Sequence, residues 1–423
     1  MIKSCPLLFN DPAYPGTIDP EHLCLNYSTV PLKLRQARFR GRLTAEPLIN
    51  LSEYQVKAVF DWLEIYLQTK EEHYAWRIQR WLTEQNAELS AFRSCFVGGP
   101  TRRRGTTGRS FVIRFQDPQP KGLRSLLRAV LDRYCSEGTE LDELPLVGLE
   151  LSLDIYPIAQ LAKTPEAYAA RRMIMTDLIR KHVLVHDAHR EEGSRPRFTY
   201  DTDGETNTPK VFDEPKGRLK VKLARDAAAL GIAVEDLSIL HPSLHQQPYL
   251  DATFYYGKKG QKVHFRCMDK ITDQRTALGA KSLPFEQSRS RIELTFIDEV
   301  PLDRLGPAYV DLNYLGDIAT RGLKGFNLFL QFGLPTFTPS TENPSEPNRD
   351  EWEIFSKSGV AGLAYFQDVQ LKLDAAKSGR KLRDRRELMS TGQCRRYSDL
   401  NRRVSKALNR LHETWERGWG RDY

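Results

Sequence analysis

The sequence predicts an α+β protein in which mixed or antiparallel sheets are covered by helices. Two kinds of pattern point to this class: segments in which apolar and polar residues alternate, and separate segments with an amphipathic helical period. The clearest alternating stretch spans residues 249–299 and predicts strands at 253–256, 262–268 and 289–297. A short glycine-bounded turn, GKKG at 257–260, separates the first two strands, so we expect them to form a hairpin.

Length and composition narrow the class of protein. A chain of 423 residues has room for roughly two to three domains and a substantial core. Its 63 Lys and Arg against 55 Asp and Glu give a net charge of +8, which favours a polyanionic partner such as nucleic acid. The six cysteines show no CxxC spacing, which argues against a zinc ribbon or a disulfide framework.

No run of about 18 apolar residues is present, and the first residues lack the apolar core of a secretory signal. We therefore expect a cytoplasmic protein with no membrane partner.

The order of the predicted elements divides the chain into four parts. Residues 1–90 are predicted to be an N-terminal arm and helical segment, and residues 91–338 the α+β core. The polar stretch 339–351 has the composition of a linker, and 352–423 is predicted to be a basic helical C-terminal segment.

The N-terminal part is predicted to be irregular up to residue 50 and helical afterwards. Ser52 has the character of a helix N-cap, with Gln55 at the capping-box position. The apolar stripe of this predicted helix consists of Val56, Val59, Phe60, Leu63 and Leu67.

Two strands, 91–97 and 110–115, are predicted next, joined by the glycine-rich loop 98–109. The loop lacks the GK[ST] ending of a phosphate-binding P-loop. Its arginines suit a hairpin tip that contacts DNA phosphates, and an ordinary exposed turn is the alternative. These candidate DNA-binding residues are Arg102, Arg103, Arg104 and Arg109.

Helices are predicted at 122–135, from Thr164 to about His189, and at 222–230. The second places His182, His186 and His189 on one face, which we interpret as a polar face because the glutamate of an HExxH zinc motif is missing.

A last helix, 399–415, carries an apolar stripe on one side and cations on the other. DNA binding is one interpretation of the cations, and solvated charges on a bundle helix are the other. The cations are Arg402, Arg403, Lys406 and Arg410.

The strand predicted at 146–156 is unusual because it carries acids on an otherwise apolar segment. Glu150 and Asp154 share one face, about 13 Å apart at ~3.3 Å per residue, opposite a row of leucines. The strand 289–297 has the same character, since Arg291 and Glu293 lie opposite apolar neighbours. Acids are poor strand formers, so these need a metal ion, a cationic partner or solvent. For Arg291 and Glu293, solvated cross-strand partners are the simpler interpretation.

The residue types together match the requirements of a metal-dependent tyrosine nuclease. A tyrosine hydroxyl is a weak nucleophile until a base or a metal activates it. Glu150, Asp154 and Glu293 are the candidate metal ligands, and Tyr255 or its neighbour Tyr256 is the candidate nucleophile. The candidate phosphate-binding cations are Arg266, Lys270 and Arg291.

Over roughly residues 90–300 the order of these motifs resembles the Rep_trans-type rolling-circle replication initiators and the related relaxases of integrative conjugative elements. That family has an R-x-D-x-x-x-D strand, then T-x-Y-x-G, R-x-Y-D-K and R-x-E-x-E. Residues 148–154 (GLELSLD) keep both carboxylates of the first motif without its arginine. Residues 253–257 (TFYYG) match the second motif, and 266–270 (RCMDK) have Met in place of the aromatic residue. Residues 291–295 (RIELT) have Thr in place of the second acid.

The resemblance implies a replication-initiator-like nuclease core that nicks and rejoins one DNA strand at a replication or transfer origin, on a plasmid, phage or integrative element. It implies Tyr255 as nucleophile, Mg²⁺ or Mn²⁺ as cofactor, and a homodimer or a host helicase as further partners. A non-catalytic DNA-binding protein, such as a repressor or a structural phage or plasmid protein, is the alternative. An RNA-binding protein is a third, which would need exposed aromatic residues on the sheet.

Overall fold

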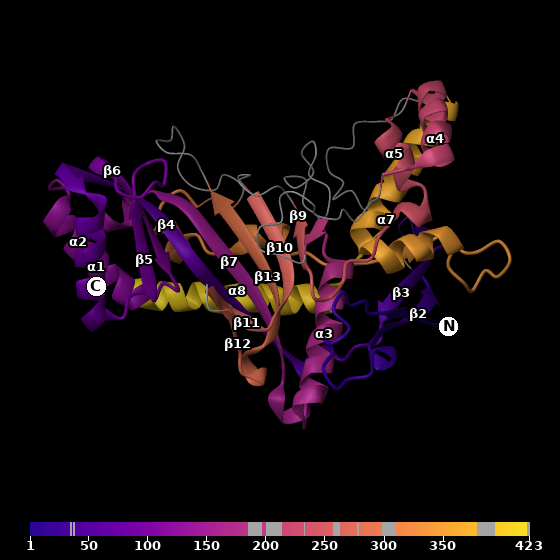
Figure 1. Ribbon diagram of the computed structural model, residues 1–423, viewed down its shortest axis with the longest axis horizontal. Helices are drawn as coiled ribbons and strands as arrows, with labels where there is room; N and C mark the ends of the chain where they lie inside the picture. The colour runs from indigo at the N-terminus through magenta and orange to yellow at the C-terminus, as the bar shows by residue number, and fades with distance from the viewer. Residues whose placement is uncertain are drawn as a thin grey trace.

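The computed structural model describes residues 1–33, 36, 39–184, 197–199, 214–231, 233–256, 263–276, 279–297, 310, 312–378 and 394–420. All structural statements below concern these residues. They form an α+β fold built on antiparallel sheets (Figure 1). Within these parts of the chain, none of the helices combines the length and apolar character needed to cross a membrane.

The largest sheet has eight strands, and every neighbouring pair is antiparallel. In spatial order the strands are β5 (Ser94–Gly98), β6 (Thr107–Gln116), β4 (Tyr54–Tyr74), β7 (Leu146–Pro157), β13 (Arg289–Ile297), β10 (Val263–Lys270), β9 (Thr253–Tyr256) and β8 (Arg197–Thr199).

Smaller sheets complete the strand content of the described residues. A four-stranded sheet contains β1 (Ile2–Pro6), β2 (Cys24–Pro31), β3 (Leu43–Pro47) and β15 (Thr336–Phe337). Two two-stranded sheets pair β11 (Thr272–Thr276) with β12 (Gly279–Ser282) and β14 (Gly333–Leu334) with β16 (Arg395–Arg396).

The α-helices are α1 (Ala75–Leu89), α2 (Pro120–Tyr134), α3 (Pro165–His182), α4 (Gly217–Leu230), α5 (Val234–Ile239), α6 (Asp317–Thr320), α7 (Arg349–Ser378) and α8 (Ser398–Trp419). In Figure 1, α1 and α2 lie at the β5–β6 end of the large sheet, while α4, α5 and α7 lie at the far end of the molecule. The long helix α8 runs behind the middle of the sheet.

One face of the large sheet is apolar and packs against helices. Leu151 of β7 pairs with Leu294 of β13, and both are fully buried. Helix α3 contacts this face, where the Thr176 hydroxyl donates to Ser290 at 2.8 Å. Helix α8 contacts β4 on the same side, with the ring of Trp415 5.5 Å from that of Phe60. The opposite face therefore carries the polar residues of these strands.

Several predicted elements are confirmed with small shifts in their ends. The strands at 253–256 and 289–297 have the predicted bounds, and the strand at 262–268 runs from Val263 to Lys270. β9 and β10 are antiparallel neighbours, as expected for a hairpin, while the turn at 257–260 lies outside the described residues.

The helix predicted to begin at Ser52 is wrong, because residues 54–74 form the long strand β4. The apolar residues Tyr54, Val56, Ala58 and Phe60 alternate with more exposed ones, which is the period of a strand. The same segment also offers apolar residues at helical spacing, so local pattern alone is ambiguous. Pairing with β7 and β6 selects the strand.

The expectation of an irregular first 50 residues is also wrong, because β1, β2 and β3 lie there. Prolines occupy the last position of each of these strands, where the loss of an N–H is tolerated.

The histidine helix, α3, ends at His182 instead of continuing to residue 189; His186 and His189 lie outside the described residues. His182 is buried and not on a polar face. Its Nδ1 lies 2.7 Å from the carbonyl oxygen of Gly333 and its Nε2 lies 3.0 Å from the Tyr27 hydroxyl.

Candidate functional site

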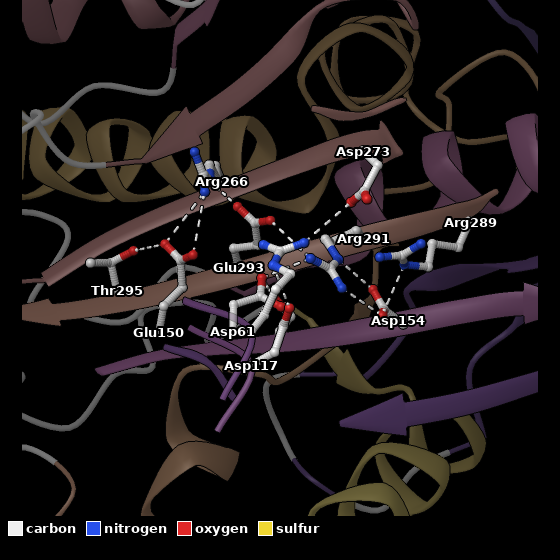
Figure 2. Close-up of polar contacts among 12 residues, drawn as sticks. Asp61, Asp117, Glu150, Asp154, Arg266, Asp273, Arg289, Arg291, Glu293 and Thr295 are labelled. Atoms are coloured by element: carbon white, nitrogen blue, oxygen red, sulfur yellow. Dashed lines mark hydrogen bonds and ion pairs between the residues drawn. The ribbon is translucent and has the colours of Figure 1, made fainter. Parts of the chain in front are cut away.

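Three carboxylates converge on the polar face of the large sheet (Figure 2). Asp61 of β4, Glu150 of β7 and Glu293 of β13 each present an oxygen within 4.8 Å of the others. Their strands are adjacent in the sheet, so pairing brings together residues that are up to 232 positions apart in the chain. We refer to these three residues as the acid triad.

Asp61 lies on the face of the triad because it continues the alternation of β4, in which Lys57 pairs with Asp154 and Val59 with Ser152. Phe60 pairs with Leu151 and Trp62 pairs with Glu150, so Asp61 is an extra residue on β4. Trp62, the next residue, pairs with Glu150 and projects to the same side, so the bulge places two consecutive residues of β4 beside Glu150. The Asp61 carboxylate accepts a hydrogen bond of 2.6 Å from the Ser152 hydroxyl, which fixes its orientation.

Two arginines lie among the triad carboxylates. Arg291 places Nη1 2.7 Å from Asp61 and 3.4 Å from Glu293. Arg266 contacts Glu293 and lies 3.4 Å from Glu150 (Figure 2). The Glu150 carboxylate also accepts a hydrogen bond of 2.6 Å from Thr295. These contacts balance the negative charge that burial would otherwise leave uncompensated.

Asp154, an expected metal ligand, is instead held by arginines. Arg291 donates to both its oxygens, at 2.5 and 2.7 Å, and Arg289 contacts it at 2.9 Å. Burial by itself would lower the pKa of Arg291, but the hydrogen bonds and charge of Asp154 raise it above its ordinary value. The structure therefore brings Glu150 and Glu293 together as expected, with Asp61 in the place that the sequence suggested for Asp154.

Tyr255 lies on the same face of the sheet as the acid triad. It pairs with Arg266 on β10, and Arg266 pairs with Glu293 on β13. Directly paired residues project to the same side, and two strand spacings separate Tyr255 from Glu293 by about 10 Å between Cα atoms. All three side chains line one cavity of about 290 Å³. Tyr256 lies on the opposite face, 2% exposed and packed against Phe265.

Lys270 connects this cavity to a larger one. It lines both the cavity beside Tyr255 and a cavity of about 800 Å³ that contains the acid triad. Burial, together with the nearby charges of Arg291 and Arg289, lowers the pKa of the Lys270 ammonium. Within the described residues no carboxylate forms an ion pair with it.

The loop arginines expected to bind DNA have different environments. Arg102 makes an ion pair of 2.9 Å with Glu64, a fully buried residue that also binds Arg114 at 2.7 Å. Its neighbours Arg103, Arg104 and Arg109 are exposed. Of the four, the latter three therefore present their charges to solvent, Arg103 and Arg104 in the turn between β5 and β6 and Arg109 near the start of β6.

The cations of the last helix line a further cavity of about 860 Å³, between α8 and strands β4 and β7. Arg402, Lys406 and Arg410 are exposed, and Arg403 is half-buried. The apolar side of the helix, including Leu400, is buried as the stripe predicts.

Sequence reasoning missed Asp61 and Glu64, because their segment was assigned to a helix. The signal was present in the alternation of residues 54–61, YQVKAVFD, which places every second residue on one face. The pairing of β4 with β7, which brings Asp61 beside Glu150, has no local signal in the sequence.

Comparisons with known proteins found no sequence match and a remote structural similarity. No protein family matches the sequence, and no curated protein matches it. A solved structure described as a rolling-circle replication initiator protein from Geobacillus stearothermophilus is similar over 57% of this chain and 75% of that chain, with 11% identity and a TM-score of 0.22. That TM-score is too low to support an argument about fold or function.

Proposed function

We propose that this protein nicks and rejoins one strand of DNA through a covalent phosphotyrosine on Tyr255, and so starts rolling-circle replication or transfer. The observation that carries the proposal is that Tyr255 lies on the same sheet face as the acid triad and lines one cavity with Glu293 of the triad. A phenol beside clustered acids and arginines is suited to phosphoryl chemistry. The resemblance of the motif order to replication initiators supports the same reading.

The acid triad fits a divalent metal ion. Three carboxylates with oxygens within 4.8 Å of one another supply the hard ligands that Mg²⁺ and Mn²⁺ prefer. When bound there, such an ion would polarise the non-bridging oxygens of a phosphate and offset the charge that builds up on them. Arg266 and Arg291, which contact the triad, would then be freed in part to donate to the same oxygens.

The chain's own residues account for the remaining roles. The Tyr255 oxygen forms a bond to phosphorus as the bond from phosphorus to the leaving sugar oxygen breaks. That oxygen takes up a proton and Tyr255 loses one, so charge is balanced over the step. Lys270, which lines the cavities on both sides, donates to the phosphate. The phosphotyrosine retains the energy of the cleaved bond, so rejoining is the reverse reaction.

Labelled single-stranded oligonucleotides that tile the DNA flanking the coding sequence test the proposal. With Mn²⁺, the wild-type protein should form an adduct that survives denaturing electrophoresis. Tyr255→Phe should abolish it, whereas Tyr256→Phe, which removes a hydroxyl from the other face, should retain it. Equal adduct formation by wild type and Tyr255→Phe would exclude Tyr255 as the nucleophile.

One observation favours a second candidate, a DNA-binding protein without catalysis. Arg266 and Arg291 already pair with every acid of the triad, so the site is electrostatically satisfied without a metal. In that case the wild-type protein binds the oligonucleotides but gives no adduct with any of them, with or without Mn²⁺.

A further inference from the structure

Two of the cavities described above are parts of one groove. The cavity that contains the acid triad and the cavity under α8 share residues on both walls. Lys57 of β4 and Arg410 of α8 line both of them. Residues 54–60 of β4 pair with β7 and precede the pairing with β6, so the groove runs from the triad around this edge of β4 and toward the N-terminal half of α8. We call it the α8 groove.

Charge changes along the α8 groove. The cavity at the triad is lined by six carboxylates and seven cationic side chains, so it is nearly neutral overall. The cavity under α8 has one carboxylate, Glu286, against five cations: Lys57, Arg402, Arg403, Lys406 and Arg410. A strongly positive channel therefore leads to a balanced site.

The cations of α8 are spaced regularly along the groove. Arg402, Lys406 and Arg410 follow one another at intervals of four residues, which places them on one stripe of the helix. The stripe spans about 12 Å at ~1.5 Å per residue. Its Arg410 end reaches the cavity of the acid triad, and its Arg402 end does not.

We infer that the α8 groove holds the phosphates of a single DNA strand on one side of the phosphate that Tyr255 attacks. This inference rests on the proposed function and assigns the route by which the strand reaches the site. Volumes of about 800 and 860 Å³ lie in the range that encloses a small organic ligand, so they suit a few nucleotides. A duplex segment of the same length brings twice as many nucleotides, which these volumes do not hold.

The salt dependence of binding tests the groove. Binding of a fluorescent 30-nucleotide single strand by the full-length protein, in EDTA so that no cleavage occurs, is measured at several salt concentrations. R402Q/K406Q removes two cations that line only the α8 end. The slope of log affinity against log salt should become shallower by about 1.4, because each phosphate contact contributes ~0.7.

A matched control removes two equally exposed cations elsewhere. R218Q/K222Q has the same spacing on α4, at the far end of the molecule in Figure 1, and should leave the slope unchanged. Equal effects of the two double variants, or no effect of R402Q/K406Q, would overturn the inference. So would an equal loss of slope for a duplex of the same sequence.

The two experiments distinguish an error in the proposed function from an error in the inference about the α8 groove. Tyr255→Phe should bind the single strand with the wild-type slope while forming no adduct. R402Q/K406Q should need a higher DNA concentration than the wild-type protein to form the adduct. An adduct retained by Tyr255→Phe excludes the proposed nucleophile and leaves the salt-slope result to decide the groove.

Discussion

Arg291 and Asp154 form a two-pronged ion pair in which both guanidinium donors on one edge meet both carboxylate oxygens, at 2.5 and 2.7 Å. The remaining edge of the same guanidinium reaches Asp61 at 2.7 Å. Arg291 therefore connects the acid triad to a carboxylate outside it. All three residues lie on adjacent strands of the large sheet, and Arg291 pairs directly with Asp154.

Replacing Arg291 with Met should destabilise the fold by about 3–5 kcal/mol, because it leaves buried carboxylates without their cation. Arg291→Lys should recover only part of this, since an ammonium cannot bind two oxygens in the same planar geometry. Urea unfolding measures the loss. Arg80→Met, at the exposed ion pair with Glu84, is the control and should change stability by less than about 1 kcal/mol. A small loss of unfolding free energy in Arg291→Met would show that the buried acids do not need Arg291 as their cation.

Asp61→Asn should abolish stabilisation by Mn²⁺, because it removes one carboxylate of the triad. A ligand present at 100 times its dissociation constant stabilises the native state by about 2.7 kcal/mol, which a thermal unfolding series with added Mn²⁺ detects. Asp117→Asn is the control, since Asp117 lines the same cavity but pairs with Arg93. If Asp154→Asn removes the Mn²⁺ effect and Asp61→Asn retains it, the ligand set predicted from sequence is the correct one.

Buried His182 should make stability depend on pH below neutrality. Burial lowers its pKa to about 4 from an ordinary value near 6.5, so the folded protein holds it neutral. The stabilisation is complete above pH 6.5 and is lost as pH falls toward 4, with a limit of about 3 kcal/mol for this residue. His182→Gln should flatten the pH profile of urea midpoints over that window. An unchanged profile would mean that other groups control acid unfolding.

Gly148→Ala should destabilise the protein by about 1–3 kcal/mol through overpacking. A Cβ on Gly148 would lie 2.8 Å from a Glu64 carboxylate oxygen and 3.1 Å from the Trp62 ring. Glu64 cannot easily move away, because Arg102 and Arg114 hold it in a buried position. Gly108→Ala, with open space around its Cβ, is the matched control for thermal unfolding. Equal melting temperatures would show that the Glu64 side chain can adapt.

Substitution of the exposed arginines between β5 and β6 should affect DNA binding, whereas substitution of Arg102 should affect stability. We expect R103Q/R104Q/R109Q to weaken DNA binding and leave the melting temperature unchanged, since all three side chains are exposed. Arg102→Gln should instead lower the melting temperature, because it removes a partner of buried Glu64. Anisotropy titrations and thermal unfolding of the two variants measure both effects. Wild-type DNA affinity in the triple variant would exclude this turn as a DNA contact.

The sequence predicted an element correctly where its residue pattern is compatible with only one kind of secondary structure. β9, β13 and β7 alternate so regularly that their bounds and faces follow from residue order. That alternation also places Glu150 and Glu293 on polar faces. The choice of strand neighbours, which brings Tyr255 to the same cavity through Arg266, depends on contacts distant in the chain and has no local signal.

The remaining errors have a common physical origin. Residues 54–74 satisfy both a strand and a helix period, and only their pairing with β6 and β7 decides between them. Asp154 was expected to bind a metal because it shares a face with Glu150. Spacing along one strand cannot show that arginines from β13 occupy its oxygens.

The length of β4 has a practical consequence for dissecting the molecule. Its first residues border the acid triad, and its last residues pair with β6. A fragment starting at residue 91 would lack Asp61 and would expose the edges of both β6 and β7 where β4 had joined them. Bare strand edges of this kind promote aggregation, so such a truncation is expected to yield insoluble material instead of a folded fragment.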